Sequence, residues 1–393
     1  MSRSASQFAP WPSYTNDEIE AVRSVLASGK VNYWTGTEAR EFEREHAVSA
    51  ATRHAIALAN GTVALELALA VYVVGPGDEV ITSPRTFVAS ASCAVMRGAL
   101  PIFADVDPDS QNITAASIER VLTKKTRALI PVHLAGWPCE MDAILELAQA
   151  HNLIVIEDCA QASGALYKGR PVGGLGHAGA FSFCQDKIIT TGGEGGMLTI
   201  SDEAIWSRAW SFKDHGKSFD AVFRREHSPG YRWLHESFGT NWRMTEMQAA
   251  IGRLQLRNLP QSIKSRTENA SLLREGLIGT PGLRIPSAPD HIQHAYYKFY
   301  VFVELQALRA GWSRDRIMAE VGAKGVPCFS GSCSEVYLEK AFDPPGYRPA
   351  NRLPVARELG DSSLMFLVHP TLGAEQMEFT KDAVTYVMRE AIR

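Results

Sequence analysis

The sequence predicts an α/β protein in which a large domain with a mostly parallel sheet precedes a smaller α/β domain. From about residue 54 to residue 158, short apolar segments alternate with segments of helical, amphipathic spacing. This alternation is typical of a parallel sheet covered by helices on both faces. The chain has 393 residues, and its texture changes near residue 261. We therefore expect a large domain over residues 1–260, with an N-terminal arm, and a small domain over 261–393.

The individual elements follow from this pattern. Thr15 and Glu18 have capping-box spacing ahead of an apolar helical face, and Gly29 ends that helix. Strands are expected at 78–84, 101–106, 127–134, 153–158, 177–185, 195–200 and 294–305. Helices are expected at 61–74, 87–98, 114–122, 140–152, from about 202, at 244–259 with an end at Pro260, at 312–325 and at 374–391.

Composition and charge exclude several classes of protein. Lys and Arg number 40 and Asp and Glu 43, so the net charge is −3 and gives no reason to expect a nucleic acid or a membrane surface as partner. The six cysteines form no CxxC pair, so we expect no metal site and no disulfide framework. The beginning of the chain lacks an apolar signal core, and 62–75 is too short to span a bilayer. These features predict a cytoplasmic protein.

Residues that could carry chemistry follow the predicted strands. Ligands of open parallel sheets bind beyond the carboxyl ends of the strands, where Asp158 and Lys187 are expected, and Gly61 and Thr62 begin a helix whose free N–H groups could hold a phosphate. Taken singly, these are an ordinary strand-end carboxylate, a surface lysine and a helix cap. Together they match pyridoxal phosphate (PLP), which needs an anion site, an acid for its pyridine nitrogen and an amine for its aldehyde. Phe87 could cover the ring.

Six segments in order carry a family resemblance: ANGTVALELAL, GDEVITSPRTFVASA, VHLAGWPCEMD, VIEDCAQASGA, GAFSFCQDKIITTGGEGGML and NWRMTEMQAAIG. Over roughly residues 10–260 the chain resembles the DegT/DnrJ/EryC1/StrS family of sugar aminotransferases. The resemblance implies the PLP-dependent transferase fold type I, similar to aspartate aminotransferase, with a large mixed sheet domain and a small C-terminal α/β domain.

The resemblance also implies roles for residues around the cofactor. Lys187 matches the Schiff-base lysine, which moves a proton between the substrate carbon and the cofactor. Asp158 matches the partner of the pyridinium nitrogen, Gln161 the donor to the phenolic oxygen, and Phe87 the residue stacked on the ring.

The family's phosphate ligands are matched by Gly61, Thr62 and Ser182. Asn241 resembles an asparagine that reaches the cofactor phosphate of the neighbouring subunit, so a homodimer with shared sites is implied. The sequence departs from the family at Ile188, where asparagine is usual, and at 326–332, where relatives often carry a His-Tyr-x-x-Pro-x-His-like segment near the substrate.

Other residues have two interpretations at this stage. Trp34, His133 and His215 are candidate substrate contacts, although His133 could equally be a buried structural residue and Trp34 a packing residue. Residues 174–179 satisfy GxGxxG but precede a strand, so a tight turn is expected rather than a dinucleotide site. The glycines of 192–196 are expected to let the backbone pass close to the lysine. The aromatic residues of 296–300 are expected to pack the small domain.

These features together predict a PLP-dependent aminotransferase that moves an amino group from an amino acid, glutamate being expected, to a keto sugar linked to a nucleotide. The alternatives are a PLP-dependent sugar dehydratase, a non-catalytic regulator with the same fold and a nicotinamide oxidoreductase. Lys187 argues against the dehydratase, in whose relatives a histidine replaces the lysine. Lys187 and Asp158 together argue against the regulator.

Overall fold

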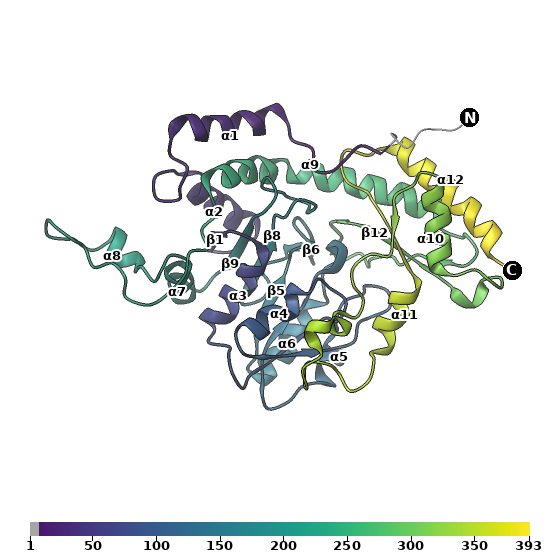
Figure 1. The fold of residues 1–393 in the computed structure, drawn as a ribbon, viewed down its shortest axis with the longest axis horizontal. Coiled ribbons are helices and arrows are strands. Elements are labelled where there is room, and N and C mark those ends of the chain that lie inside the picture. Colours follow the sequence, from purple (N-terminus) through teal and green to yellow (C-terminus); the bar gives the residue numbers. More distant parts are fainter. Residues whose placement is uncertain (1–7) are drawn as a thin grey trace.

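A seven-stranded sheet lies at the centre of the large domain (Figure 1). The computed structural model describes residues 8–393, so the first seven residues of the predicted N-terminal arm lie outside the described part. The strand order is β1-β9-β8-β5-β4-β2-β3, and β9 alone runs against the others. The strands are β1 His54–Leu58, β2 Glu79–Thr82, β3 Leu100–Phe103, β4 Thr126–Ile130, β5 Ile154–Asp158, β8 Ala178–Ser182 and β9 Gly196–Ile200. The predicted mostly parallel sheet is confirmed.

Helices cover this sheet because its strands are apolar on both faces. Every residue of β2, β8 and β9 is buried, as expected for strands enclosed on both sides. The helices of the large domain are α2 Glu38–Ser49, α3 Gly61–Val71, α4 Ala89–Met96, α5 Ala115–Glu119, α6 Met141–His151, α7 Glu203–Lys213 and α8 Phe219–Phe223.

Helix α1 (Asn16–Ser28) has the ends that its sequence predicts. The Glu18 N–H donates to the Thr15 hydroxyl at 3.3 Å, and the Thr15 N–H donates to the Glu18 carboxylate at 2.6 Å, which completes a capping box. At the other end Gly29 adopts φ 68°, a left-handed conformation that suits glycine.

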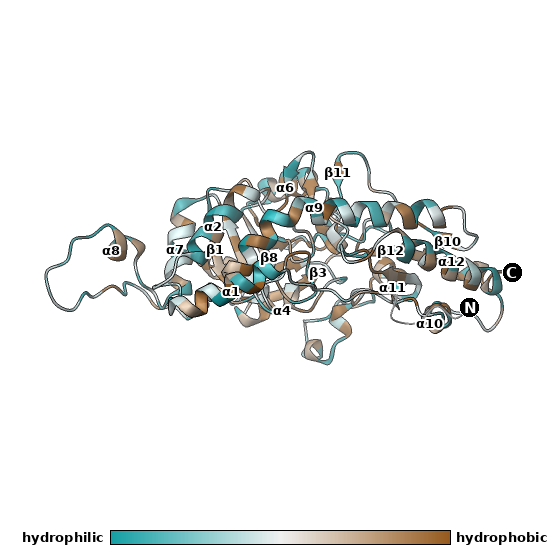
Figure 2. Ribbon diagram, turned by 90° about the horizontal axis from the view of Figure 1, so that it is seen from above, coloured by the Kyte–Doolittle hydropathy of each residue, from teal (hydrophilic) through white to brown (hydrophobic). Residues whose placement is uncertain are grey.

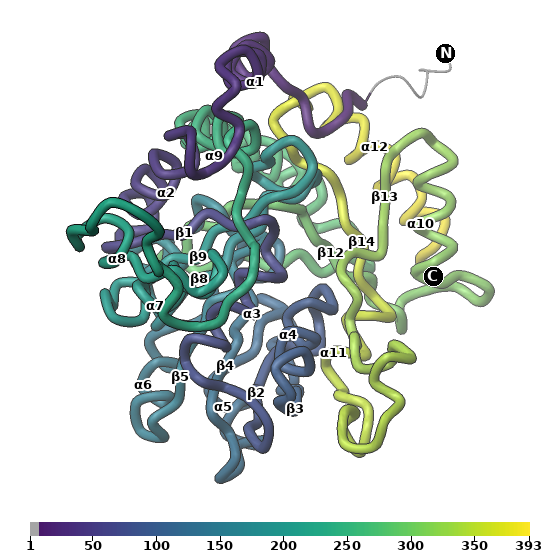
Figure 3. The backbone as a smooth tube through the Cα atoms, turned by 60° about the vertical axis from the view of Figure 1, so that its left-hand side comes forward, coloured from purple at the N-terminus to yellow at the C-terminus, as the bar shows by residue number. Residues whose placement is uncertain are grey.

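The C-terminal part builds a second, antiparallel sheet of four strands in the order β10-β12-β14-β13. In Figure 3 this part, coloured light green to yellow, lies beside the large domain. The strands are β10 Leu283–Arg284, β12 Phe299–Val303, β13 Cys328–Phe329 and β14 Ser363–Phe366, and the helices are α10 Arg314–Ala323, α11 Pro354–Ser362 and α12 Ala374–Ala391. A smaller, third sheet has three strands in the order β11-β6-β7. They are β11 Ile292–Gln293, β6 Leu166–Tyr167 and β7 Arg170–Pro171.

The expectation that a helix ends at Pro260 is wrong. Helix α9 (Glu246–Leu277) is 32 residues long and includes Pro260 in its interior. Figure 1 shows it crossing from α1 and α2 to α12. An interior proline costs roughly 3 kcal/mol. Leu259 and Ile263, on either side of it, are both buried in the core of the large domain, and this packing outweighs the local cost. The predicted boundary between residues 260 and 261 therefore falls inside a continuous helix.

None of the helices within residues 8–393 combines the length and the apolar character needed to cross a membrane.

Candidate active site

Two cavities adjoin at the carboxyl edge of the large sheet. The smaller one, of about 480 Å³, lies over the ends of β5 and β8 and the start of α3. The larger one, of about 900 Å³, lies between this edge and the C-terminal part of the chain. The residues that line both cavities are Thr86, Phe87, Gln161, Asp186 and Lys187. Lys187 therefore stands at the junction, where it can reach molecules in either cavity.

The sheet register brings the predicted residues of the smaller cavity together. Strand β5 ends at Asp158 and its neighbour β8 ends at Ser182. Gly196, the first residue of β9, pairs with Ser182 on one side and with Leu58, the last residue of β1, on the other. These strand ends place Asp158, Ser182 and the start of α3 around one opening.

The start of α3 fits a phosphate group. The Asn60 side chain caps the helix by accepting the Val63 N–H at 3.0 Å, while the preceding N–H groups of a helix have no partner within it. A Cβ on Gly61 would lie 2.7 Å from Ser182 Cβ, and one on Gly196 would lie 2.3 Å from the Asn60 carbonyl carbon. Glycine at both positions thus permits a close approach of the backbone; at Gly196 the neighbour is the start of α3, whereas the glycines of 192–196 were expected to let the backbone pass close to the lysine.

Asp158 has the surroundings that a cationic ring nitrogen requires. It is buried, and its carboxylate accepts the Ser90 hydroxyl at 2.6 Å and the Ala160 N–H at 3.1 Å. Burial raises the pKa of Asp158, although these two hydrogen bonds oppose the rise. A buried carboxyl of this kind gains from a nearby cation, and a protonated pyridine nitrogen is one.

Gln161 and Phe87 complete the pocket for a flat ring. The Gln161 side-chain oxygen accepts the Ala135 N–H at 2.8 Å, which leaves its amide nitrogen as a donor in the cavity wall. Phe87 lines both cavities with 67% of its surface exposed, which is high for a phenylalanine. The donor set, the glycine-lined cradle and the exposed ring fit PLP.

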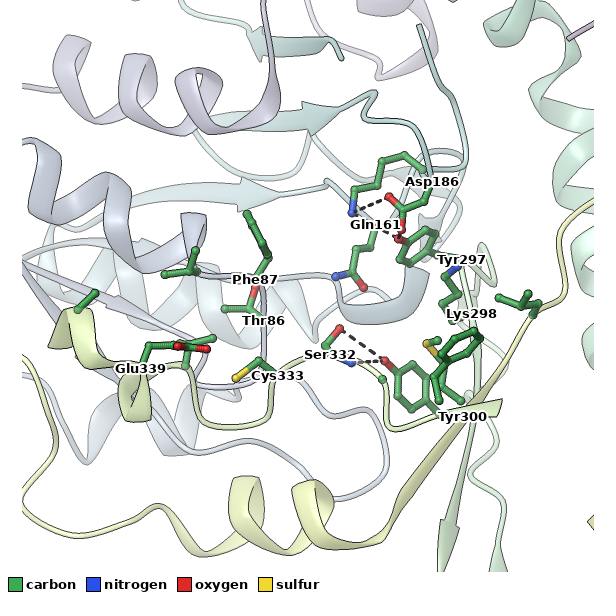
Figure 4. Close-up of a pocket in the computed structure, with 18 of the residues that line it drawn as sticks. Thr86, Phe87, Gln161, Asp186, Tyr297, Lys298, Tyr300, Ser332, Cys333 and Glu339 are labelled. Carbon is green, nitrogen blue, oxygen red and sulfur yellow. Dashed lines mark hydrogen bonds and ion pairs between the residues drawn. The ribbon is translucent and has the colours of Figure 1, made fainter. Parts of the chain in front are cut away.

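Two residues of the larger cavity, Asp186 and Tyr297, hold Lys187, and Figure 4 shows these two side chains close together. The Lys187 Nζ donates to the Tyr297 hydroxyl at 3.4 Å and lies 3.8 Å from the Asp186 carboxylate, which in turn accepts a hydrogen bond from the Tyr297 hydroxyl. Burial opposes ionisation of Asp186, but the charge of Lys187 and the bond from Tyr297 lower its pKa. Burial and the Asp186 charge raise the pKa of Tyr297, so this phenol stays protonated.

A family model for the DegT/DnrJ/EryC1/StrS aminotransferases matches residues 12–385. The chain belongs to this family. It is a PLP-dependent aminotransferase, and the match continues into the C-terminal part, beyond the region where the sequence motifs lie. Because the family and the cofactor are established, the oxidoreductase and non-catalytic alternatives no longer apply.

Individual relatives agree along the whole chain. An aminotransferase structure from Psychrobacter cryohalolentis is 56% identical, with a TM-score of 0.96 over 98% of this chain and 99% of that one. The spore coat polysaccharide biosynthesis protein SpsC of Bacillus subtilis is 34% identical over 100% of both chains. GDP-perosamine synthase of Caulobacter vibrioides is 38% identical over 73% of this chain and 74% of its own.

The aminotransferase does not bring all of its predicted site residues to the cavities. His133 is completely buried; its Nε2 lies 3.0 Å from the Glu157 carboxylate and its Nδ1 accepts the Cys139 N–H at 3.0 Å. Of the two interpretations of His133, the structure therefore has the buried structural residue and not the substrate contact. Glu157 also accepts three backbone N–H groups from 173–176, so the GxGxxG segment is a tight turn around a buried carboxylate.

Trp34 likewise packs rather than lining a described cavity. Its ring meets Trp210 edge-on at 6.0 Å and stacks on Phe223 at 6.3 Å, and the Lys217 ammonium lies 4.3 Å from its centre. His215 and Asn241 are exposed and line neither cavity of the single chain, so their roles stay predictions.

Asp186, Tyr297, Lys298 and Tyr300 line the larger cavity and were missed in the sequence. The two tyrosines had been expected only to pack the small domain. The strand predicted over 294–305 begins only at Phe299, because Tyr296 adopts φ 46° and the Tyr297 N–H donates to the Ala135 carbonyl of the large domain at 2.8 Å. The one feature of the sequence that could have indicated a site here is a charged residue, Lys298, within the otherwise aromatic run of 296–300.

Proposed function

We propose that this aminotransferase moves an amino group from glutamate to a keto sugar linked to a nucleotide. The observation that carries the proposal is the pair of cavities that meet at Lys187, one of a size and polarity for PLP and the other large enough, at about 900 Å³, for a nucleotide-linked sugar. The relative in Caulobacter vibrioides is a GDP-perosamine synthase, which supports a substrate of this class.

The residues around the junction suit transamination. When bound, PLP supplies an aldehyde that takes up the amino group and a ring that draws electrons from the substrate carbon. The Lys187 Nζ, held by Tyr297, would take the proton from that substrate carbon and pass it to the cofactor carbon that bears the nitrogen. The Asp158 carboxylate would keep the proton on the ring nitrogen, and the Gln161 amide nitrogen would donate to the ring oxygen.

The wall opposite the cofactor supports a hydroxyl-rich substrate. The Ser332 N–H donates to the Tyr300 hydroxyl at 2.9 Å, and both residues line the larger cavity with Phe329, Cys333 and Glu339. Tyr300 belongs to β12, Phe329 and Ser332 belong to the segment 326–332 that departs from the family motif, and Cys333 and Glu339 follow that segment. The choice of sugar is therefore expected to depend on this segment.

An exposed aromatic segment supports a homodimer with shared sites. Residues 219–240 include α8 and extend away from the body of the chain in Figures 1 and 2. Within it Phe238 is 99% exposed and Trp233 78% exposed, more than such side chains usually are on a free surface. We propose that a second copy covers this segment and that Asn241, exposed at its end, reaches the cofactor phosphate of that copy.

The six cysteines are all unpaired, which fits the reducing cytoplasm that we propose as the location of the enzyme.

Lys187→Ala tests the assignment. Wild-type protein incubated with PLP should show the visible absorbance of the lysine-bound cofactor, and it should convert a nucleotide-linked 3-keto or 4-keto sugar to an amino sugar, detected by mass spectrometry. The variant should lose both properties and keep its fold, while the control Lys324→Ala, at an exposed lysine of the small domain, should keep both. Turnover by Lys187→Ala near the wild-type rate would refute the proposal.

A further inference from the structure

Lys298 lies in the wall of the larger cavity beside the reacting lysine. It directly precedes β12, and its Nζ lies 4.7 Å from the centre of the Tyr297 ring. The Lys187 Nζ lies 4.9 Å from the centre of the same ring. The distance between the ammonium nitrogens of Lys187 and Lys298 therefore cannot exceed the sum of these two distances. Figure 4 shows Lys298 next to Tyr297 in the cavity wall.

No acidic group pairs with Lys298. Within residues 8–393 its ammonium makes no ion pair or hydrogen bond, and its one described contact is the Tyr297 ring. Asp186, the acid whose charge acts on it, lies closer to Lys187 and accepts the hydroxyl of Tyr297. A half-buried ammonium that lines a cavity without a counter-ion is a binding group for an anion.

A second cation lies behind Lys298 and is not neutralised either. Arg266 is almost completely buried, and its Nη1 donates to the carbonyls of Tyr296 and Tyr297 at 3.3 Å each. Its Nε and Nη2 have no hydrogen-bond partner in the described structure, and its guanidinium lies 5.2 Å from the centre of the Trp11 ring. Burial lowers the pKa of the nearby His369 to about 3, and the charges of Arg266 and Lys298 add to that effect, so this imidazole is neutral. The net charge around Lys298 is positive.

Lys298 itself remains a cation at neutral pH. Burial lowers its pKa to about 8, with smaller contributions from Arg266 and Lys187, while Asp186 acts in the opposite direction. Below that pH its ammonium offers three hydrogen-bond donors to the cavity.

The position of Lys298 selects between the anions that the two substrates offer. In an amino acid, the α-carboxylate is attached to the carbon that carries the amino group, so it must lie within a few ångströms of Lys187 during transfer. In a nucleotide-linked sugar, the diphosphate is attached to the anomeric carbon, and the sugar ring separates it from the carbonyl that receives the nitrogen. The ammonium of Lys298 shares the Tyr297 ring with Lys187, which brings a carboxylate on the reacting carbon within reach, and the titration below separates this anion from the diphosphate.

We propose that Lys298 binds the α-carboxylate of the amino donor and that Arg266 reinforces the positive potential at this site. This assignment rests on the proposed aminotransferase function. It explains how one cavity serves two unlike substrates in turn: the donor is fixed by a charge beside Lys187, and the sugar by hydroxyl-binding groups farther along the wall.

Binding measured without turnover tests the assignment. Lys187→Ala protein loaded with the amine form of the cofactor is titrated calorimetrically with 2-oxoglutarate, with 2-oxobutyrate, which has only the one carboxylate, and with GDP. Adding Lys298→Gln should raise the dissociation constants of both oxo acids about 10- to 100-fold, the effect of losing one charged hydrogen bond. Lys298→Arg should restore most of the affinity, and the matched control Lys324→Gln should change nothing.

Three results would overturn the assignment. The first is unchanged binding of both oxo acids by Lys298→Gln. The second is a loss confined to 2-oxoglutarate, which would point to its distal carboxylate, and the third is a loss confined to GDP, which would point to the diphosphate. The wild-type enzyme separates this failure from that of the proposed function. If glutamate does not bleach its lysine-bound cofactor, the proposal that glutamate is the amino donor fails. If glutamate bleaches wild type and Lys298→Gln at the same half-saturating concentration, the Lys298 assignment alone fails.

Discussion

Gly61→Ala tests whether the cofactor site depends on the close packing of α3 against β8. A Cβ at position 61 would lie 2.7 Å from Ser182 Cβ, 3.1 Å from Ser182 Cα and 3.3 Å from the Phe181 carbonyl oxygen. Carbon atoms pack at about 3.5–4.0 Å, so the two backbones would have to separate by roughly 1 Å. Strand β8 resists this movement because β5 and β9 are hydrogen-bonded to its two sides.

The cost has two expected parts. Overpacking of this kind lowers the free energy of unfolding by about 1–3 kcal/mol. The same displacement separates Ser182 from the N–H groups of Gly61 and Thr62, the groups expected to hold the phosphate. We therefore expect the dissociation constant for PLP to rise at least about tenfold, which corresponds to about 1.4 kcal/mol of binding free energy.

Urea denaturation of the cofactor-free protein and an absorbance titration with PLP measure these two quantities. The matched control is Gly322→Ala in α10, where a Cβ would meet nothing within 4 Å and alanine favours the helix, so stability should stay equal or rise. If Gly61→Ala unfolds at the wild-type urea concentration and binds PLP with wild-type affinity, the close approach of Gly61 to Ser182 has no role in the site.

Three further predictions concern the charges of the site. Asp158→Asn should leave the fold intact but slow single-turnover amino transfer by orders of magnitude, because the ring nitrogen loses the charge that holds its proton; an unchanged rate would make Asp158 an ordinary strand-end carboxylate. Asn241→Asp and Lys187→Ala chains, each inactive alone, should regain up to about a quarter of wild-type activity when mixed, because one site of the mixed dimer is intact; no recovery in confirmed heterodimers would rule out shared sites. Burial lowers the pKa of Lys298 to about 8 in the wild-type chain, and Lys187→Ala removes one of the charges that lower it, so in this variant the dissociation constant of 2-oxoglutarate should be constant at low pH and rise about tenfold per unit above a break that lies above pH 8. Lys298→Arg should remove this break, and a break that persists would assign it to another group.

The sequence predicted the part of the site that the large sheet alone positions. Asp158 and Ser182 end neighbouring strands, and the carboxyl ends of parallel strands meet at one edge, so strand-end residues could be grouped before any coordinates. Tyr297 and Lys298 could not be found in this way. The contact of Tyr297 with Lys187 spans 110 residues of sequence, Lys298 follows Tyr297 directly, and no local pattern encodes such a separation.

Local rules also failed where packing opposes them. Pro260 predicts the end of a helix, but Leu259 and Ile263 are buried only if the helix continues, and that gain decides the outcome. The sequence left two interpretations of His133 open, a substrate contact and a buried structural residue, because a strand end does not show which way a ring points. The structure has the second: the ring lies in the core, where its Nε2 is 3.0 Å from the Glu157 carboxylate and its Nδ1 accepts the Cys139 N–H.

The continuous helix α9 also has a mechanical consequence. At 1.5 Å per residue its 32 residues form a helix about 48 Å long, which packs on α1 and α2 at one end and on α12 at the other. Any rotation of the C-terminal part relative to the large domain must therefore bend this helix. Pro260 has no N–H for the Leu256 carbonyl, so bending stiffness is lowest there. The Tyr297 N–H is bonded to the Ala135 carbonyl of the large domain, so flexure at Pro260 would move β12, and Tyr300 with it, relative to Lys187 while Tyr297 stays in place.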